Sequence, residues 1–446
     1  MKIKFFTFLF LSLMFLEAHA SQDTGTFHFK TEETVLKNGL KVILVEEHKA
    51  PVATVQIWYK VGSRNELTGK TGLSHLMEHM MFKGTPKYGK GEFSRKVQKN
   101  GGNDNAFTSQ DYTAFFENFS SDRIWLSLDL ESDRMGHLLI DPTEFLLERD
   151  VVKEERRLRT DDNPADFLSE QLYAQAYEAH PYHSPVIGWM TDLDHLTRQD
   201  IYDHYKKYYL PNNATLVIVG DFNSSKLLTE IKKYFDPIPA GGPVSQVQII
   251  EPDQRGERRF WVKKEAQMPS ILIGFKSPNF KDNDHFPLTV LSTLLSSGKS
   301  SRLYRQLVYE KKIALEIETD YNELSADPAL FSIYGKTQKG RSSEELESAI
   351  LAEIDQLKTT SVTETELQKT INQIETQFIL SRDSNFFVAM ELGIAESVGA
   401  GSHYFDTYLD SIKKVTPNDI QRVARKYFSS DSKTTGILVP LPQEKR

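Results

Sequence analysis

Hydrophobic and polar positions alternate along the first part of the chain as they do in β-strands. An Asn38-Gly39 pair separates two apolar runs within Glu33–Glu46, which is the strongest short-range signal for a β-hairpin. Residues Val52–Val61 carry apolar side chains at every second position, and this period of two predicts a strand that is buried on one face. Ala214–Gly220 is apolar throughout and predicts a buried strand. The pattern therefore indicates β-structure on both sides of a long helical region.

Helical periodicity predicts the elements of that region. Apolar residues recur at the spacing of an amphipathic helix in residues 122–135 and 144–158, and further helices are expected at 166–177, 197–208 and 224–234. Shorter helices are expected at Gly72–Phe82 and Phe93–Asn100. The predicted helix at 144–158 is rich in acidic residues.

A stretch of proline and glycine at Asp236–Pro243 is the clearest linker in the chain. Beyond it the order of elements repeats, with a strand at Pro269–Lys276, a helix at Leu288–Leu295 and a last strand at Thr434–Val439. Further helices are expected at 342–357, 364–380 and 417–427. The sequence thus predicts two similar α+β halves of about 200 residues, which are residues 21–236 and 247–446, with a linker at 237–246.

Residues 1–20 have the pattern of a secretory signal peptide. Lys2 and Lys4 precede the apolar run Phe5–Leu16, and Ala18-His19-Ala20 ends it with small residues at the positions that a signal peptidase reads. An uncleaved membrane anchor is the alternative, but this run is shorter than the roughly 20 residues that a spanning helix needs. We expect cleavage after Ala20, export to a bacterial periplasm and no stable membrane span afterwards. Secretion from another cell type stays open.

Charge and cysteine content narrow the chemistry. The formal net charge of −8 is spread along the chain without a basic stripe, so nucleic-acid binding is not expected. The chain has no cysteine, so an exported form would depend on core burial alone, which its length allows. Without thiolates, any zinc must be held by histidine and carboxylate side chains.

Candidate chemistry centres on His75, Glu78 and His79, which form the pattern H-x-x-E-H. Side chains four apart on a helix share a face, so both imidazoles can reach one ion, and Glu78 can touch a metal-bound water. H-x-x-E-H is a metalloprotease signature. The alternative is a helix with two solvated histidines, but the apolar residues around the motif indicate burial, and an unliganded buried His-Glu-His face would be costly.

Two further regions could complete a site. A catalytic zinc usually has three protein ligands and one open position, and the acidic helix at 144–158 is the best source of the third, because Glu148 and Glu155 share one face. Short strands are expected after Gly101-Gly102, where glycine allows close backbone approach. Asn105–Thr108 would then be either a plain surface hairpin or a sheet edge that binds an extended peptide.

Three stretches together resemble the pitrilysin/insulinase family of inverted-motif zinc peptidases, especially its two-domain processing-peptidase branch. They are His75–Thr85, Gly101–Thr113 and Glu148–Glu155. The resemblance implies an α+β fold of two similar halves, each a mostly antiparallel sheet covered by helices, which together form half of a clamshell.

The resemblance also implies roles for individual residues. In that family the third zinc ligand is a distant glutamate, and a supporting glutamate precedes it by seven residues. Aligned on this chain, Glu155 becomes the ligand beside His75 and His79 for one Zn²⁺ per chain, and Glu148 becomes the catalytic helper. Glu154 is the fallback ligand, and a solvated helix face is the alternative for both. Glu78 would be the general base, and Asn105, Ala106, Phe107 and Thr108 would bind the peptide substrate.

The second half departs from the family pattern. Active members, or their partners, carry an arginine and then a tyrosine that reach the substrate backbone near the zinc. Here Tyr309 stands where the arginine is expected, Leu315 stands where the tyrosine is expected, and Arg302 and Arg305 lie off register. We therefore expect the zinc-bearing subunit of a heterodimer whose homologous partner supplies the missing groups. A homodimer or a monomer is the alternative.

The expected activity is that of a zinc metalloendopeptidase that hydrolyses peptides or unfolded polypeptide segments. A different class is a non-catalytic or weakly catalytic assembly or substrate-binding subunit of a homologous complex. The intact His75-Glu78-His79 motif argues against that class. An exported zinc-storage protein is disfavoured because Glu78 would then have no role.

Overall fold

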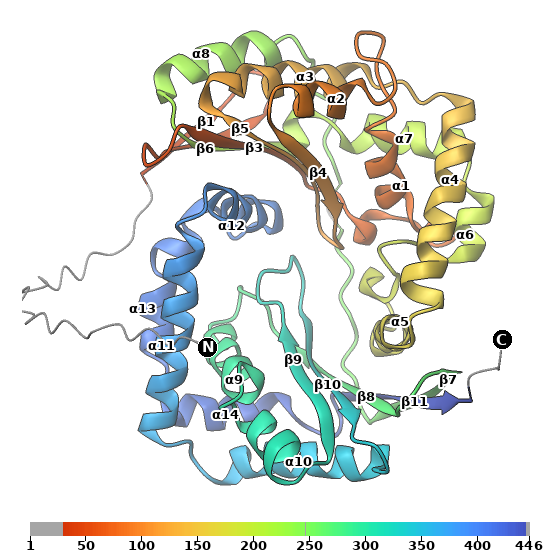
Figure 1. Cartoon of the computed structure of the whole chain (residues 1–446), viewed down its shortest axis with the longest axis vertical. Helices are drawn as coiled ribbons and strands as arrows, with labels where there is room; N and C mark the ends of the chain where they lie inside the picture. Colours follow the sequence, from red (N-terminus) through yellow and green to blue (C-terminus); the bar gives the residue numbers. More distant parts are fainter. Residues whose placement is uncertain (1–29, 246, 443–446) are drawn as a thin grey trace, which may run out of the picture.

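One β-sheet organises each half of the chain in the computed structural model, which describes residues 30–245 and 247–442 (Figure 1). The predicted signal peptide, residues 1–20, lies outside the described residues. The strands of the first sheet are β1 Thr31–Val35, β2 Lys41–Glu46, β3 Val52–Tyr59, β4 Asn103–Thr108, β5 Thr113–Ser120 and β6 Ala214–Gly220. Their spatial order is β1-β2-β6-β3-β5-β4. Strands β2 and β6 are parallel and the other pairs are antiparallel.

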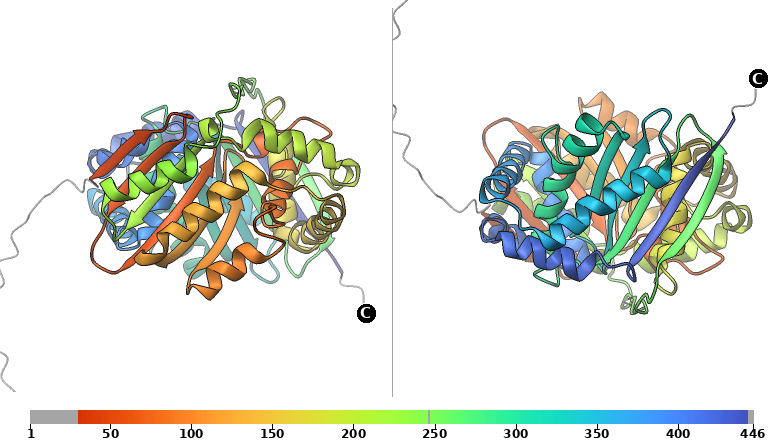
Figure 2. Two further views of the ribbon diagram at one scale, coloured as in Figure 1. Left: turned by 90° about the horizontal axis from the view of Figure 1, so that it is seen from above. Right: turned by 90° about the horizontal axis from the view of Figure 1, so that it is seen from below.

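The second sheet repeats this arrangement (Figure 2). Its strands are β7 Arg258–Glu265, β8 Ser270–Ser277, β9 Ala314–Tyr321, β10 Ala329–Thr337 and β11 Lys433–Leu441. Their order, β7-β11-β8-β10-β9, corresponds to β2-β6-β3-β5-β4, and again one pair, β7 with β11, is parallel. The predicted fold class, with two similar halves built on mostly antiparallel sheets, is confirmed.

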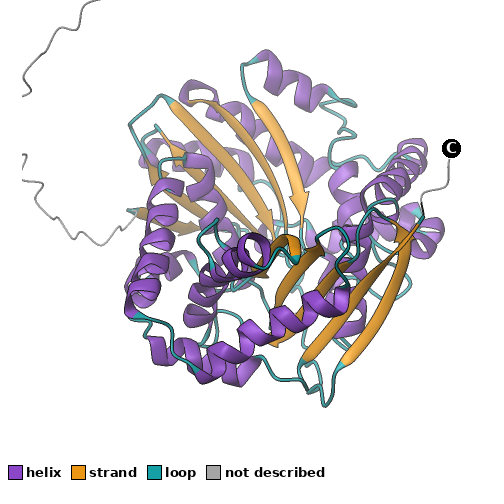
Figure 3. Ribbon diagram, turned by 60° about the horizontal axis from the view of Figure 1, so that its bottom comes forward, coloured by secondary structure: helices purple, strands orange, loops and turns teal. Residues whose placement is uncertain are grey.

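Helices flank the strands of both sheets (Figure 3). The first half contains α1 Leu73–Met80, α2 Glu92–Lys99, α3 Ile124–His137, α4 Pro142–Arg156, α5 Pro164–Ala176, α6 Met190–His195, α7 Arg198–Tyr208 and α8 Ser224–Phe235. The second half contains α9 His285–Ser296, α10 Ser343–Thr359, α11 Glu364–Ser381, α12 Asn385–Val398, α13 Tyr408–Lys413 and α14 Pro417–Tyr427. No helix among the described residues combines the length and the apolar character needed to cross a membrane.

Each half contributes one helix to the sheet of the other half. Helix α5 packs its Leu168 and Leu172 against strands β7, β8 and β11, and helix α12 packs its Val388 and Leu392 against β3 and β6. Figure 1 shows α12 directly beneath the first sheet. This exchange of helices couples the two halves through their cores.

The prediction that Val52–Val61 is buried on one face is wrong. In β3, every residue from Ala53 to Tyr59 is buried, because α12 covers the face that the sequence left to solvent. Gly393 of α12 makes this contact possible, since a Cβ there would lie 2.1 Å from the Trp58 ring. The covering helix lies more than 300 residues away in sequence, so local periodicity does not reveal it.

Between α8 and β7 the described residues form neither helix nor strand, which agrees with a linker in this region. The boundaries at 236 and 247 stay a prediction, because α5 and α12 each pack across the division between the halves.

Candidate metal centre

Helix α1 begins in a tightly packed turn. Gly72 has a φ of 88°, in the left-handed region that favours glycine, and a Cβ there would lie 2.7 Å from the Ile187 carbonyl oxygen. The Glu66 carboxylate accepts hydrogen bonds from the backbone N–H groups of Gly72 at 2.7 Å and Ser74 at 2.6 Å. These N–H groups lie at the end of the helix, where intrahelical partners are lacking. The helix that carries His75, Glu78 and His79 therefore starts from a fixed position.

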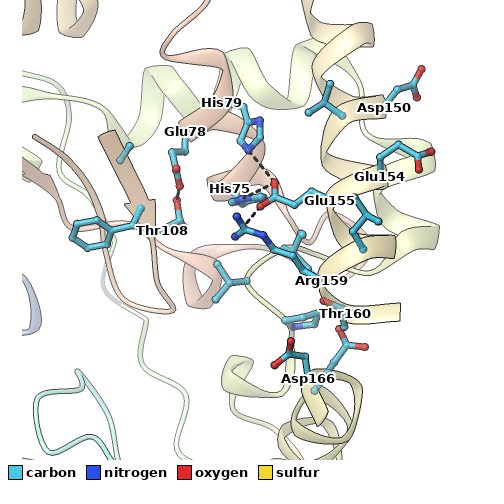
Figure 4. Close-up of a pocket in the computed structure, with 18 of the residues that line it drawn as sticks. His75, Glu78, His79, Thr108, Asp150, Glu154, Glu155, Arg159, Thr160 and Asp166 are labelled. Carbon is cyan, nitrogen blue, oxygen red and sulfur yellow. Dashed lines mark hydrogen bonds and ion pairs between the residues drawn. The ribbon is translucent and has the colours of Figure 1, made fainter. Parts of the chain in front are cut away.

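Helices α1 and α4 bring His75, His79 and Glu155 together (Figure 4). Glu155 Oε2 lies 3.7 Å from His75 Nε2 and 3.3 Å from His79 Nε2. All three ligand atoms lie within 4.8 Å of one another. Among the described residues, His75, His79 and Glu155 are the group whose donor atoms lie close enough together to hold one metal ion.

The donor atoms suit a zinc ion in both type and spacing. Zinc binds imidazole nitrogen and carboxylate oxygen at about 2.0–2.2 Å, which sets tetrahedral donors roughly 3.3–3.6 Å apart. The two distances from Glu155 are close to that spacing. A set of three protein donors also matches catalytic zinc sites, which keep the fourth position open. The residues present therefore fit the metal that the sequence predicts.

Glu148 lies behind the cluster rather than in it. Its Oε2 is 3.1 Å from His79 Nδ1, and its Oε1 pairs with Lys83. A carboxylate on the far nitrogen fixes both the ring orientation and the tautomer of a metal-binding histidine. The geometry supports a positioning role for Glu148, whereas the sequence grouped it with the catalytic residues.

Burial shapes the protonation of the cluster. It lowers the pKa of His75 to about 3, with help from the charges of His79 and Arg159, so His75 is neutral and able to bind a metal at pH 7. Burial also opposes the charged form of His79, but the hydrogen bond to Glu148 and the charges of Glu155 and Glu78 outweigh it and raise the pKa of His79. Burial raises the pKa of Glu78 as well, which moves this carboxyl toward the range of a general base at neutral pH.

Glu78 points toward strand β4. Its Oε2 accepts a hydrogen bond of 2.6 Å from the Thr108 hydroxyl, and Glu78 is not part of the three-residue cluster. The sequence predicted Thr108 only as a substrate-binding residue. The structure shows that its side chain also fixes the carboxylate beside the metal position.

We expect Thr108→Val to lower kcat by about 10–100-fold, because a hydrogen bond to a charged group contributes about 1.5–3 kcal/mol. Thr108→Ser keeps the hydroxyl and should retain most of the activity. Steady-state kinetics with one flexible peptide measures both variants. Equal losses in the valine and serine variants would show that the hydroxyl is not responsible.

A cavity of about 1320 Å³ surrounds the cluster and is lined by residues between positions 75 and 187. One wall is β4, where Asn105, Ala106, Phe107 and Thr108 all line the cavity. Strand β4 is the last strand in its sheet and forms a hairpin with β5, so the stretch lies at a sheet edge, and peptide binding there stays a prediction. The opposite wall is α4 with the turn that follows it, and these expose apolar side chains to the cavity, Leu147 and Val151 from α4 and Leu158 from the turn.

Glu154, the fallback ligand, lines the same cavity but points elsewhere. It forms an ion pair with Arg157, and its side chain is 64% exposed. It is absent from the metal-type cluster, so the geometry favours Glu155.

Among the described residues, none of the second half lines this cavity. Tyr309 and Leu315 are exposed. Arg302 pairs with Glu366 at 2.8 Å and Arg305 pairs with Glu310 at 2.7 Å. Neither arginine therefore replaces the group that the family pattern leads one to expect.

Prediction from the sequence did not identify three groups that contact the cluster, Glu148 or the start of α1, which are Glu66, Lys83 and Arg159. Arg159 follows Glu155 by four residues and pairs with it at 3.0 Å. That spacing was visible in the sequence, whereas the contacts of Glu66 with the start of α1 follow from the loop conformation.

Comparisons with known proteins agree with this geometry. Residues 41–189 match the family model described as insulinase (peptidase family M16), and residues 195–374 match the model described as peptidase M16 inactive domain. The chain is 36% identical over 437 residues to the zinc protease PqqE of Helicobacter pylori, covering 96% of this chain and 97% of that protein. It is 25% identical over 395 residues to the uncharacterized zinc protease YmxG of Bacillus subtilis, covering 89% of this chain and 95% of that protein.

Solved structures show the same fold. The crystal structure of a protease from Helicobacter pylori matches with a TM-score of 0.90 at 36% identity, covering 92% of this chain and 100% of that chain. The periplasmic protease PqqL from Escherichia coli matches with a TM-score of 0.77 at 17% identity, covering 92% of this chain but 48% of that chain. Two repeated halves with an inverted histidine motif are the architecture of a two-domain metallopeptidase. The chain belongs to peptidase family M16, the pitrilysin/insulinase family.

Proposed function

We propose that this chain is a zinc-dependent endopeptidase that cleaves peptides and unfolded polypeptide segments. The convergence of His75 Nε2, His79 Nε2 and Glu155 Oε2 beside a free sheet edge carries the proposal. The family membership and the zinc protease names of its relatives support it.

The residues around the cluster have separable roles in hydrolysis. A zinc ion held by His75, His79 and Glu155 would polarise the scissile carbonyl and lower the pKa of a bound water toward ~7. Glu78, held by Thr108 at 2.6 Å, takes a proton from the attacking water and delivers it to the leaving amine. Glu148 keeps His79 oriented through Nδ1.

Strand β4 would hold the substrate. Its outer edge has no neighbouring strand in the described sheet, so an extended peptide can add to it through backbone hydrogen bonds. A segment paired within a folded domain must first be released before it can add to this edge, so flexible peptides are the expected substrates. The apolar wall of α4 faces the same cavity and can contact their side chains.

The proposed enzyme also includes a homologous partner subunit. Every described residue that lines the cavity comes from the first half, and the second half places neither arginine nor tyrosine there. A second subunit of the same fold would close the open side of the cavity and supply those groups. Export to the periplasm is proposed from the pattern of residues 1–20, and the periplasmic relative PqqL is consistent with it.

Metal removal gives the first test. We expect the purified full chain to cleave a flexible fluorogenic peptide, to lose at least about 90% of that activity with a zinc chelator, and to recover it when zinc is restored, because the cluster holds a single removable ion. The same sequence embedded in a folded domain should be cleaved far more slowly. Activity that survives complete removal of the metal would contradict the proposal.

A second test concerns the partner. Tagged protein isolated from its own host should carry a homologous subunit, and this material should exceed the isolated chain in specific activity. If zinc is bound but neither preparation cleaves any peptide, the chain is a non-catalytic subunit instead.

A further inference from the structure

Glu155 presents its two carboxylate oxygens to different partners. Oε2 faces the two histidines, at 3.3 Å and 3.7 Å, while Oε1 lies 3.0 Å from the Arg159 guanidinium. A free carboxylate can bind a metal through one oxygen or through both. Here one oxygen is already engaged by a cation, the Arg159 guanidinium.

Arg159 reaches Glu155 from an irregular turn. Residues Arg157–Asp161 form a π-helical turn after α4, closed by the Asp162 N–H donating to the Arg157 carbonyl oxygen at 2.7 Å. Such turns are rare in proteins, and those that do occur often lie at functional sites. The turn leaves Arg159 lining the cavity, where it is the one lysine or arginine among the described lining residues. Figure 4 shows its guanidinium directed at Glu155.

We propose that Arg159 is a positioning residue of the metal centre, which holds Glu155 so that Oε2 alone completes the ligand set. The inference rests on the proposed zinc site. An ordinary exposed ion pair contributes little to stability, and the pair formed by Arg157 and Glu154 one turn away is of that kind. The pair formed by Arg159 and Glu155 differs because Glu155 is only 18% exposed and its other oxygen belongs to the cluster.

Repulsion between the arginine and a zinc ion works against this role but does not dominate. The Arg159 side chain is 76% exposed, so water screens its charge, and the Glu155 carboxylate with which it pairs offsets part of that charge. Orientation of the ligand is therefore the larger effect.

Zinc affinity of the full chain tests the inference, measured by competition with a chromophoric chelator at one pH. Arg159→Gln should weaken zinc binding by about 10–100-fold, as loss of an outer partner of a ligand does, while the stoichiometry at saturation stays at one. Arg159→Lys should recover part of the loss because an ammonium group retains one charged donor. The matched control is Arg157→Gln, which removes an arginine from the same turn and should change the affinity by less than about twofold, since Arg157 contacts no ligand.

Thermal unfolding of the metal-free proteins separates positioning from a structural role. All four proteins, the wild type included, should unfold at closely similar temperatures without zinc. Unchanged affinity in Arg159→Gln, equal losses in the two glutamine variants, or a lower unfolding temperature of metal-free Arg159→Gln alone would overturn the inference. A wild-type chain that binds no zinc would instead remove the proposed function.

Discussion

Glu78→Gln should lower kcat for peptide hydrolysis by about 10²–10⁴-fold, the usual contribution of a general base, while zinc stays bound. The amide is nearly the same size as the carboxylate and can still accept the Thr108 hydrogen bond, but it cannot take a proton from water. Glu78 lies outside the ligand cluster, so the change leaves all three proposed ligands in place. Single-turnover kinetics together with elemental analysis measures both quantities on one preparation.

Glu154→Gln is the matched control for that experiment. Glu154 lines the same cavity, and the substitution replaces its carboxylate with an amide of nearly the same size. In the wild type this carboxylate pairs with Arg157 and not with the cluster. The kcat of Glu154→Gln should stay within about threefold of wild type, as expected for an exposed pair. Full activity in Glu78→Gln, or an equal loss in both variants, would remove the assigned role of Glu78.

His75→Ala and His79→Ala should each abolish stoichiometric zinc binding. Each variant leaves two protein ligands where a catalytic zinc site uses three, and His79→Ala also leaves the carboxylates of Glu148 and Glu155 without their shared imidazole. Zinc per chain after dialysis, measured by elemental analysis, should fall from about one to near zero.

An exposed histidine of the second half provides the control for metal loss. His403 pairs with Asp406 at 2.9 Å and lies outside the cluster, so His403→Ala should keep one zinc per chain. Retention of a full equivalent of zinc in both motif variants would place the metal elsewhere.

Local pattern predicted the repeated elements well because their signals are short-range. The Asn38-Gly39 turn sets the register in which Val35 pairs with Lys41, and the predicted helices at 144–158 and 197–208 correspond to α4 and α7. Helix α12 was missed because it is apolar on most of its surface and lacks a polar face. Its partners, the strands β3 and β6, lie far away in sequence.

The candidate site shows the same limit. Spacing alone placed His75 and His79 on one face of a helix, and the family resemblance made Glu155 the third ligand with Glu154 as the fallback. Distinguishing them required the packing of α4 against α1, which turns Glu155 inward and leaves Glu154 in solvent. The side-chain contact between Thr108 and Glu78 likewise depends on how β4 lies against α1, which no local pattern encodes.

Anomalous diffraction at the zinc edge, from crystals of the zinc-loaded chain, would locate the metal directly. We expect one peak, within bonding distance of His75 Nε2, His79 Nε2 and Glu155 Oε2 at about 2.0–2.2 Å, with Glu78 beyond that distance. A peak that Glu155 does not reach, or loaded crystals with no peak between α1 and α4, would contradict this expectation.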